Sequence, residues 1–238
     1  MISKSNPKFE DLFSTVGDAI LIDKPLLWSS FKVIYFLRKN SVVKKAGHAG
    51  TLDPLATGLL IVCTAKKTKE IYTYQDQGKQ YTGSFMLGKT TPSMDAESEV
   101  SEEKDFSHVT NEMIYDTVNQ FSGEISQVPP MFSAVNYKGK KLYKLARKGK
   151  VVERAPKIVT IHNFEITEIS LPFVKFKIDC SKGVYIRSIA HDFGQALGCG
   201  AYLTELRRTK IGDYSVDDAF TPDELTKSYF PAIDSPVS

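Results

Sequence analysis

The sequence predicts an α+β fold built on a mixed, largely antiparallel sheet. Strand-like runs follow one another without the regular alternation of strand and helix that is typical of parallel sheets. Residues 174–180 alternate apolar and polar side chains, which predicts a half-buried strand. Residues 59–63 form an uninterrupted apolar run, which is typical of a buried strand.

The first predicted elements lie between residues 19 and 40. Residues 19–22 are an apolar run that predicts a short strand, closed by the sequence Asp23-Lys24-Pro25. Ser29 and Ser30 can cap a helix that continues to about residue 40. We expect this helix to have an apolar side that consists of Phe31, Ile34, Tyr35 and Leu37.

The middle of the chain combines regular patterns with an acidic segment. Residues 66–77 and 111–121 predict helices, and residues 81–87 predict a strand. Residues 92–108 carry six carboxylates, with Lys104 as their counter-charge, and therefore predict a mobile, solvated insertion. These carboxylates belong to Asp95, Glu97, Glu99, Glu102, Glu103 and Asp105.

The C-terminal part of the chain predicts two helices and a further strand. A helix over 187–197 ends at Gly198, and a strand follows over 202–210. Thr221 can cap a last helix that has Pro222 at its first position. The sequence contains no internal repeat and no evident linker, so we expect a single domain over residues 1–238.

Composition and charge limit the class of protein. The 238 residues, 42% of them hydrophobic, suit one large domain or two small ones. The net charge of +3 neither requires nor excludes a nucleic-acid partner. Three cysteines without pair spacing argue against a disulfide framework, and we expect Cys63 and Cys180 to pack in the core. The spacing of histidine and cysteine does not match a zinc site.

The sequence points to a cytoplasmic protein. The N-terminal residues are polar and lack the apolar segment of a signal peptide. No run reaches the ~18 apolar residues of a membrane span. We therefore expect no membrane association, and no obligate protein partner is evident.

Asp53 lies in a loop rich in glycine and proline at residues 47–58. Pro54 disfavours helix at the preceding residue, so Asp53 is expected to adopt an extended or turn geometry. Loop residues on a rigid scaffold are often catalytic. An Asp-Pro pair is also a common turn starter, so the spacing alone leaves both interpretations open.

Six motifs along the chain form a specific combination. They are residues 47–60 (GHAGTLDPLATGLL), 79–81 (KQY), 127–134 (QVPPMFSA), 139–143 (GKKLY), 180–188 (CSKGVYIRS) and 206–208 (LRR). In this order they resemble segments of the bacterial tRNA pseudouridine synthase B family. The resemblance extends over about residues 20 to 215.

This resemblance implies a pseudouridine synthase fold, with a central mixed sheet flanked by helices and loops. It also implies isomerisation of the T-loop uridine at position 55 of tRNA. The base must be flipped out of the RNA, at a cost of a few kcal/mol. In the family, Asp53 matches the carboxylate nucleophile and Arg187 the guanidinium that holds it ionised. The reaction needs no cofactor and no metal, and the implied partner is tRNA, bound through its T-arm stem-loop.

The family also implies roles for the residues of the substrate pocket. Tyr81 matches the tyrosine that stacks on the target base and helps to move its proton. The other matched positions are His48, Tyr185, Leu206 and Lys24. The alternatives are packing in the core for the two tyrosines and Leu206, an ordinary loop position for His48, and a surface position at a helix start for Arg187.

A basic segment lies between Lys138 and Lys157, where nine Lys and Arg residues face one acid, Glu153. A random charge run of this kind is usually a solvated helix face. Phosphate contacts of such a patch are independent of RNA sequence and weaken with salt. Since the resemblance covers this segment, we expect contacts with the RNA backbone from Lys140, Lys141, Lys144, Arg147 and Lys148.

Two departures from the family are visible. Ala49 stands where the family more often has threonine, which removes a possible hydrogen bond in the loop. The chain ends at Ser238, so we expect it to lack the C-terminal RNA-binding domain of many relatives.

Two other functions compete with this interpretation. Residues 83–90 match the phosphate-loop pattern, but they alternate like a strand, and Pro92 follows instead of a helix. We therefore expect a chance match. The second alternative is an RNA-binding protein without catalytic activity, which would have no need of Asp53 and Arg187.

Overall fold

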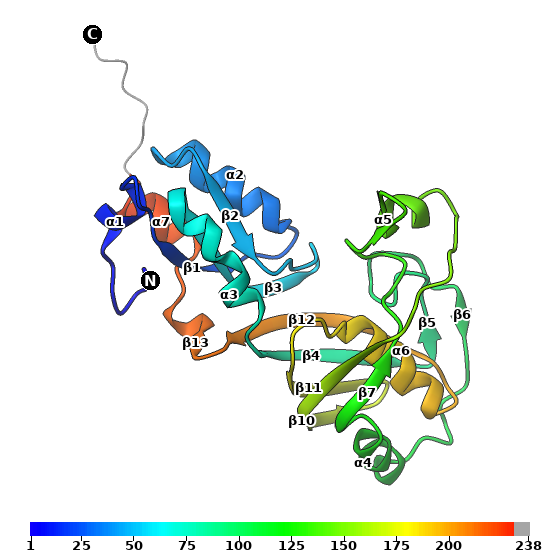
Figure 1. Cartoon of the computed structure of the whole chain (residues 1–238). Helices are drawn as coiled ribbons and strands as arrows, with labels where there is room; N and C mark the ends of the chain where they lie inside the picture. The colour runs from blue at the N-terminus through cyan, green and yellow to red at the C-terminus, as the bar shows by residue number, and fades with distance from the viewer. Residues whose placement is uncertain (231–238) are drawn as a thin grey trace. The chain divides into compact units, whose positions relative to one another are not determined.

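The computed structural model describes residues 1–230 and contains a nine-stranded sheet in that part of the chain (Figure 1). The strands run in the order β1–β3–β12–β4–β11–β10–β7, with β2 paired to β3 and β13 to β12. Their bounds are β1 Ala19–Lys24, β2 Ala46–Ala49, β3 Ala56–Thr64, β4 Lys79–Leu87, β7 Gly123–Gln127, β10 Lys157–Ser170, β11 Phe173–Cys180, β12 Ala201–Ile211 and β13 Tyr214–Ser215. Two short hairpins, β5 (Lys89–Thr90) with β6 (Glu102–Glu103) and β8 (Asn136–Tyr137) with β9 (Lys140–Lys141), lie outside this sheet.

The pairings support a mixed and mostly antiparallel sheet. The pairs β1–β3, β2–β3, β10–β11, β7–β10 and β12–β13 are antiparallel. Isolated parallel bridges join Ile2 to Ile20 and Ile22 to Phe220. The helices are α1 Phe9–Phe13, α2 Ser30–Asn40, α3 Ile71–Gln75, α4 Asn111–Asn119, α5 Leu142–Ala146, α6 Ile186–Ala196 and α7 Pro222–Ser228. The predicted α+β class is confirmed.

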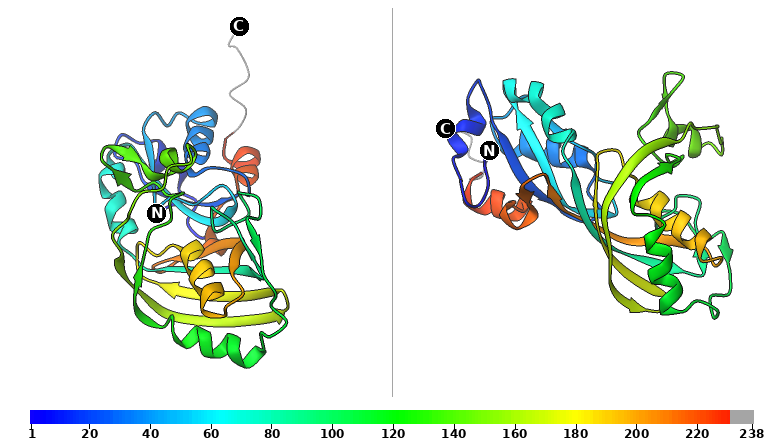
Figure 2. Two further views of the ribbon diagram at one scale, coloured as in Figure 1. Left: turned by 90° about the vertical axis from the view of Figure 1, so that its right-hand side faces the viewer. Right: turned by 60° about the horizontal axis from the view of Figure 1, so that its bottom comes forward.

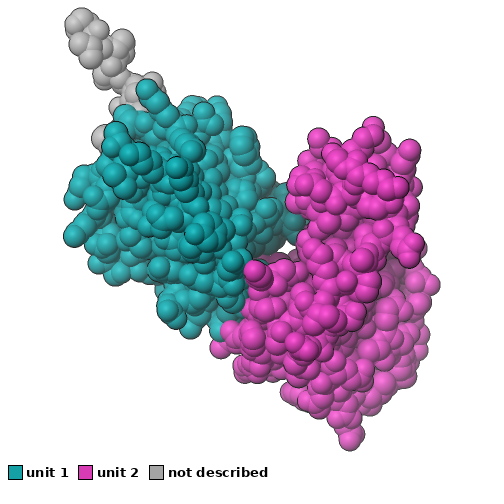
Figure 3. Space-filling view, viewed as in Figure 1, with its two compact units in different colours: residues 1–81, 207–238 teal, residues 82–206 magenta. Residues whose placement is uncertain are grey.

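The chain forms two compact units, which we describe separately (Figure 3). Unit 1 comprises Met1–Tyr81 together with the chain from Arg207 onward, and unit 2 comprises Thr82–Leu206.

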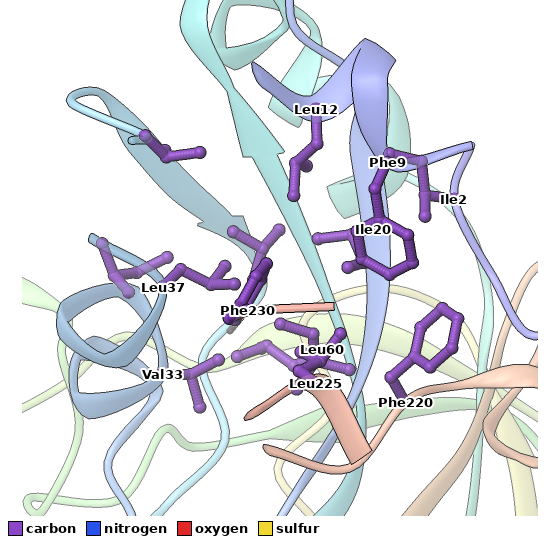
Figure 4. Close-up of a cluster of buried hydrophobic side chains, with 14 residues drawn as sticks. Ile2, Phe9, Leu12, Ile20, Val33, Leu37, Leu60, Phe220, Leu225 and Phe230 are labelled. Atoms are coloured by element: carbon purple, nitrogen blue, oxygen red, sulfur yellow. The ribbon is translucent and has the colours of Figure 1, made fainter. Parts of the chain in front are cut away.

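The core of unit 1 lies on both faces of strands β1 and β3. Ile20, Ile22, Leu60 and Val62 contribute to a cluster that also contains residues of α1, α2 and α7 (Figure 4). The alternate residues of the same strands face a second cluster that contains Tyr74 of α3. Burial of both faces explains why β3 is an apolar run without alternation.

Aromatic rings dominate the core of unit 2. Phe85 of β4 stacks on Phe176 of β11, with ring centroids 4.3 Å apart, and Phe164 of β10 and Phe193 of α6 lie against them. Helix α4 packs on β10 and on α6 (Figure 2). Strand β11 alternates between buried and more exposed residues, as its sequence predicts.

Helix α2 has the predicted bounds but a different buried face. Ser29 caps it, its side chain accepting a hydrogen bond from the backbone N–H of Lys32. The buried apolar residues are Val33, Ile34 and Leu37. The prediction that Phe31 and Tyr35 belong to this face is wrong, because they are 68% and 59% exposed on the opposite side of the helix.

The acidic segment 92–108 is held more closely than its composition suggests. Its strand β6 pairs with β5, and the backbone N–H of Leu203 donates to the carbonyl of Met94. Five of its six carboxylate residues are exposed, as expected. The sixth, Asp95, is buried, so the expectation of a solvated side chain is wrong there.

The phosphate-loop pattern at residues 83–90 is a chance match. Residues 83–87 belong to β4, and the short strand β5 follows instead of a helix. Gly83 serves strand packing, because a Cβ there would lie 2.2 Å from the carbonyl oxygen of Glu205. The helices of residues 1–230 are too short or too polar to cross a lipid bilayer.

Gly58→Ala should destabilise the protein more than Gly139→Ala. Both glycines have positive φ, at +104° and +79°, but a Cβ at Gly58 would lie 2.3 Å from the carbonyl oxygen of Arg208. At Gly139 that space is open, so we expect only backbone strain of about 1–2 kcal/mol. Urea unfolding of both variants measures the difference, and equal losses would contradict the prediction.

Candidate active site

The loop that carries Asp53 is fixed by hydrogen bonds on both sides of this residue. The hydroxyl of Ser30, at the start of α2, accepts from the backbone N–H of Leu52 at 2.8 Å and donates to its carbonyl at 3.1 Å. The N–H of Leu27 donates to the carbonyl of Pro54, and the N–H of Ala56 to that of Asp53. Asp53 itself is half-buried. Its backbone position is therefore set by the surrounding structure.

Arg208 holds both ends of the same loop. Its side chain is buried in unit 1, where Nε donates to the carbonyl of Leu59 at 2.8 Å and Nη2 donates to the carbonyl of Gly50 at 3.1 Å. These two carbonyls flank the segment that contains Asp53. Sequence reasoning noted Arg208 only as part of a motif and did not assign it a role.

Lys24 is a buried cation close to this loop. Its Nζ donates to the carbonyls of Pro25 at 3.1 Å and Trp28 at 2.6 Å. Burial lowers the pKa of Lys24 to about 8, although the negative charge of Asp53 opposes this shift. Lys24 is therefore still mainly protonated at pH 7 and contributes positive charge near Asp53.

His48 lies on β2, opposite Val62 of β3. Burial lowers its pKa, and the positive charge of Arg208 lowers that pKa further. The ring is thus neutral at pH 7. Its Nδ1 atom is buried and has no hydrogen-bond partner among residues 1–230.

An ion pair and a cavity lie beside Lys24 in unit 1. Arg207 binds the carboxylate of Asp23 through both terminal nitrogens, at 3.0 and 2.6 Å. A cavity of about 420 Å³ is lined by these two residues together with Lys24, Trp28 and Thr57, among others.

In unit 2, Arg187 occupies a buried position at the start of α6, which excludes the alternative of a surface arginine. Its guanidinium donates to the carbonyls of Ser93 at 3.1 Å and Phe132 at 2.7 Å. The carboxylate of Asp95 is 3.6 Å from its Nε. Sequence reasoning missed Asp95, because nothing in the sequence separates it from the five other acids of the segment.

Tyr185 is positioned by Gln127. The side-chain amide of this buried residue accepts from the N–H of Tyr185 at 2.7 Å and donates to its carbonyl at 3.1 Å. Leu206, in the middle of β12, is partly exposed, whereas Tyr81 on β4 is 9% exposed. The functional role of these side chains stays a prediction.

The predicted site residues are divided between the two units. Unit 1 contains Lys24, His48, Asp53 and Tyr81. Unit 2 contains Tyr185, Arg187 and Leu206. The ion pair predicted between Asp53 and Arg187 stays a prediction.

The basic segment forms an exposed surface of unit 2. Lys140, Lys144, Arg147 and Lys148 are exposed, and Lys141 is half-buried. The short helix α5 is anchored by the buried Leu142, and Arg147 is 3.3 Å from the carboxylate of Glu97. This exposure suits both an RNA contact and a solvated helix face.

Comparison with known proteins gives a consistent family assignment. A model described as "TruB family pseudouridylate synthase (N terminal domain)" matches residues 38–186. A second, "tRNA pseudouridylate synthase B C-terminal domain", matches residues 187–235.

Curated relatives carry the name tRNA pseudouridine synthase B. The protein of Flavobacterium johnsoniae is 52% identical, with 85% of this chain and 92% of the relative covered. That of Chloroherpeton thalassium is 51% identical, with coverages of 88% and 89%.

Solved structures with a similar fold include a Cbf5-Nop10-Gar1 complex, with a TM-score of 0.71 and 29% identity. The match covers 94% of this chain and 57% of that chain. An H/ACA RNP bound to a substrate RNA containing 2'-deoxyuridine matches with a TM-score of 0.68 and 27% identity, over 93% of this chain and 56% of that one.

Arg208→Gln should raise the pKa of His48, because it removes the buried charge that disfavours the imidazolium. It should also lower the free energy of unfolding by roughly 2–6 kcal/mol, since the carbonyls of Gly50 and Leu59 lose a buried donor. NMR titration of the histidine rings and urea unfolding measure the two effects.

Arg207→Gln is the matched control for Arg208, because Arg207 is partly exposed, pairs with Asp23 and reaches the loop only through the hydroxyl of Thr57, at 3.4 Å. It should leave the pKa of His48 unchanged. A His48 pKa that is the same in wild type and Arg208→Gln would contradict the proposed electrostatic coupling.

Lys24 should make stability depend on pH between about 8 and 10.5, which are its folded pKa and the ordinary pKa of lysine. In this range the unfolded chain binds more protons at Lys24, so the free energy of unfolding rises with pH. The rise should be about 3 kcal/mol at most, and Lys24→Met should lack it. Urea unfolding of the wild type and Lys24→Met at pH 7 and pH 10.5 tests this prediction. It would be refuted if the difference in the free energy of unfolding between the two proteins were the same at both pH values.

Proposed function

Because this chain belongs to the TruB family of pseudouridylate synthases, we propose that it converts the T-loop uridine of tRNA, at position 55, to pseudouridine. The curated relatives are named as tRNA enzymes, and this chain covers about nine-tenths of their length. The T-arm stem-loop is the proposed recognised element, and the cytoplasm, where tRNA is modified, is the proposed location.

The reaction breaks the bond between N1 of uracil and C1′ of ribose. The base then turns, and C5 forms the new bond to C1′, while a proton leaves C5 and N1 gains one. Atoms and electrons balance within the nucleotide, so the chemistry requires no redox partner. The uracil must leave the base stack first, at a cost of a few kcal/mol.

Asp53 is the proposed nucleophile of this reaction. The hydrogen bonds of Ser30 to Leu52 and of Arg208 to both ends of the loop support this role, because they fix the backbone that carries the carboxylate. A preorganised nucleophile needs little rearrangement when the substrate arrives. The hydrogen bonds of Ser30 and Arg208 to this loop are the main observation that supports the proposal.

Arg187 is the proposed partner that keeps Asp53 ionised when a flipped base covers it. Its carbonyl contacts and the nearby carboxylate of Asp95 hold the guanidinium in one orientation. A fixed buried guanidinium stabilises a carboxylate more than a solvated one does. Asp95 is therefore a proposed positioning residue for Arg187.

The remaining residues are proposed to bind the RNA. Tyr81 is assigned to stacking on the uracil and to movement of its proton, with Tyr185 and Leu206 lining the pocket. The neutral ring of His48 suits contact with the T-loop next to the flipped nucleotide. The basic segment is assigned to phosphate contacts through Lys140, Lys141, Lys144, Arg147 and Lys148. All of these are exposed except the half-buried Lys141.

Asp53→Asn should abolish pseudouridine formation and leave tRNA binding within about twofold of wild type, because the amide keeps the shape but not the nucleophile. Release of tritium from tRNA labelled at C5 of uracil measures turnover, and filter binding measures affinity. Asp105→Asn, which changes an exposed carboxylate of unit 2, is the control.

Turnover by Asp53→Asn at a near-normal rate would end the proposed mechanism. Tight tRNA binding by the wild type without any tritium release would instead favour the RNA-binding protein without catalytic activity.

A further inference from the structure

Helix α2 has an outward face of unusual composition for a solvated helix. Phe31, Tyr35 and Arg38 follow one another at spacings of four and three residues, and Lys32 and Lys39 lie beside them. At 3.6 residues per turn these five side chains share one stripe. All five are exposed, whereas the buried Val33, Ile34 and Leu37 lie on the opposite side. We call these five residues the α2 stripe.

The charge around the α2 stripe has one sign. Residues 24–52 contain six Lys and Arg residues and no Asp or Glu. Five of these cations are exposed, namely Lys32, Arg38, Lys39, Lys44 and Lys45. None of the five forms an ion pair with a carboxylate of residues 1–230, unlike Arg147 of the basic segment, which pairs with Glu97. The surface therefore suits a polyanion.

The two exposed aromatic rings on this basic surface indicate contact with nucleobases in addition to phosphates. Phe31 and Tyr35 are one helical turn apart and contribute little to the core. Removing the two rings from water by contact with a partner would be favourable. A flat aromatic ring can also stack on any nucleobase. Cations that follow the backbone together with rings that stack on bases are typical of sites for unpaired nucleotides.

The α2 stripe also begins beside the candidate active site within unit 1. Ser30, the residue before Phe31, forms both hydrogen bonds to Leu52, next to Asp53. Nucleotides bound at the start of the stripe are therefore near neighbours, along the RNA chain, of a base that reaches Asp53. We propose that the α2 stripe binds unpaired nucleotides of the substrate RNA, with Phe31 and Tyr35 stacking on bases and Lys32, Arg38 and Lys39 contacting phosphates. This inference rests on the proposed function.

Removal of the rings tests the stacking contact. Phe31→Ala/Tyr35→Ala should weaken binding of a tRNA transcript by about tenfold or more and leave the salt dependence of Kd unchanged. Phe31→Tyr/Tyr35→Phe, which keeps both rings, should bind like wild type. Tyr115→Ala, which removes an exposed ring on α4 of unit 2, is the matched control and should have no effect.

Removal of the charges tests the phosphate contact. Arg38→Gln/Lys39→Gln should weaken binding and lower the slope of log Kd against log salt by about one to two. Lys8→Gln/Lys227→Gln removes two exposed lysines of unit 1 elsewhere and should leave that slope unchanged. Melting temperatures of all variants should equal that of wild type, because the altered side chains are exposed.

The outcomes separate this inference from the proposed function. If the wild-type protein releases tritium and the ring variants bind tRNA as tightly as wild type, the α2 stripe is not an RNA site. That result would favour a protein or membrane partner for the stripe. Wild-type protein that releases no tritium overturns the proposed function itself. Single-stranded oligouridylate should compete for the stripe better than a duplex RNA of equal length, and the reverse order would also overturn the inference.

Discussion

The buried guanidinium of Arg208 is the constraint on which the candidate site depends. It connects the carbonyls of Gly50 and Leu59, and its own backbone lies against Gly58, where only a glycine fits. Charged donors form strong hydrogen bonds in a low-dielectric interior, and a buried carbonyl without a donor is costly. The loop between these residues therefore has little freedom, and the position of Asp53 follows from the packing of β3 and β12.

The same principle recurs at the other two buried cations of residues 1–230. Lys24 is satisfied by the carbonyls of Pro25 and Trp28, and Arg187 by those of Ser93 and Phe132. Desolvation of a charge is expensive unless hydrogen bonds replace the lost water, and these contacts hold each cation in a fixed orientation. Cations that are already oriented before the substrate binds can stabilise an anionic nucleophile during the reaction.

Helix α2 shows how one short element serves three purposes. Its inner side packs on β1 and β3, and Ser30 at its first position holds the Asp53 loop. The outer side exposes Phe31 and Tyr35, which lie between the cations Lys32, Arg38 and Lys39. A functional partner for that side gives the composition a physical reason, because both rings are mostly exposed and contribute little to the core of unit 1.

The sequence by itself determined the class of fold and most element positions, because periodicity and turn chemistry are local, and its six motifs carried the resemblance to a known family. Strand 174–180, the Ser29 cap and the Thr221-Pro222 helix start were all readable in this way. Only the tertiary structure decided that Phe31 and Tyr35 face solvent, that Asp95 is buried beside Arg187, and that Arg208 closes the Asp53 loop. Each of these depends on partners contributed by distant segments, such as the carbonyl of Gly50 for a residue 158 positions away. Local patterns carry no information about such partners, because a charged residue is the same letter in the sequence whether its side chain is buried or exposed.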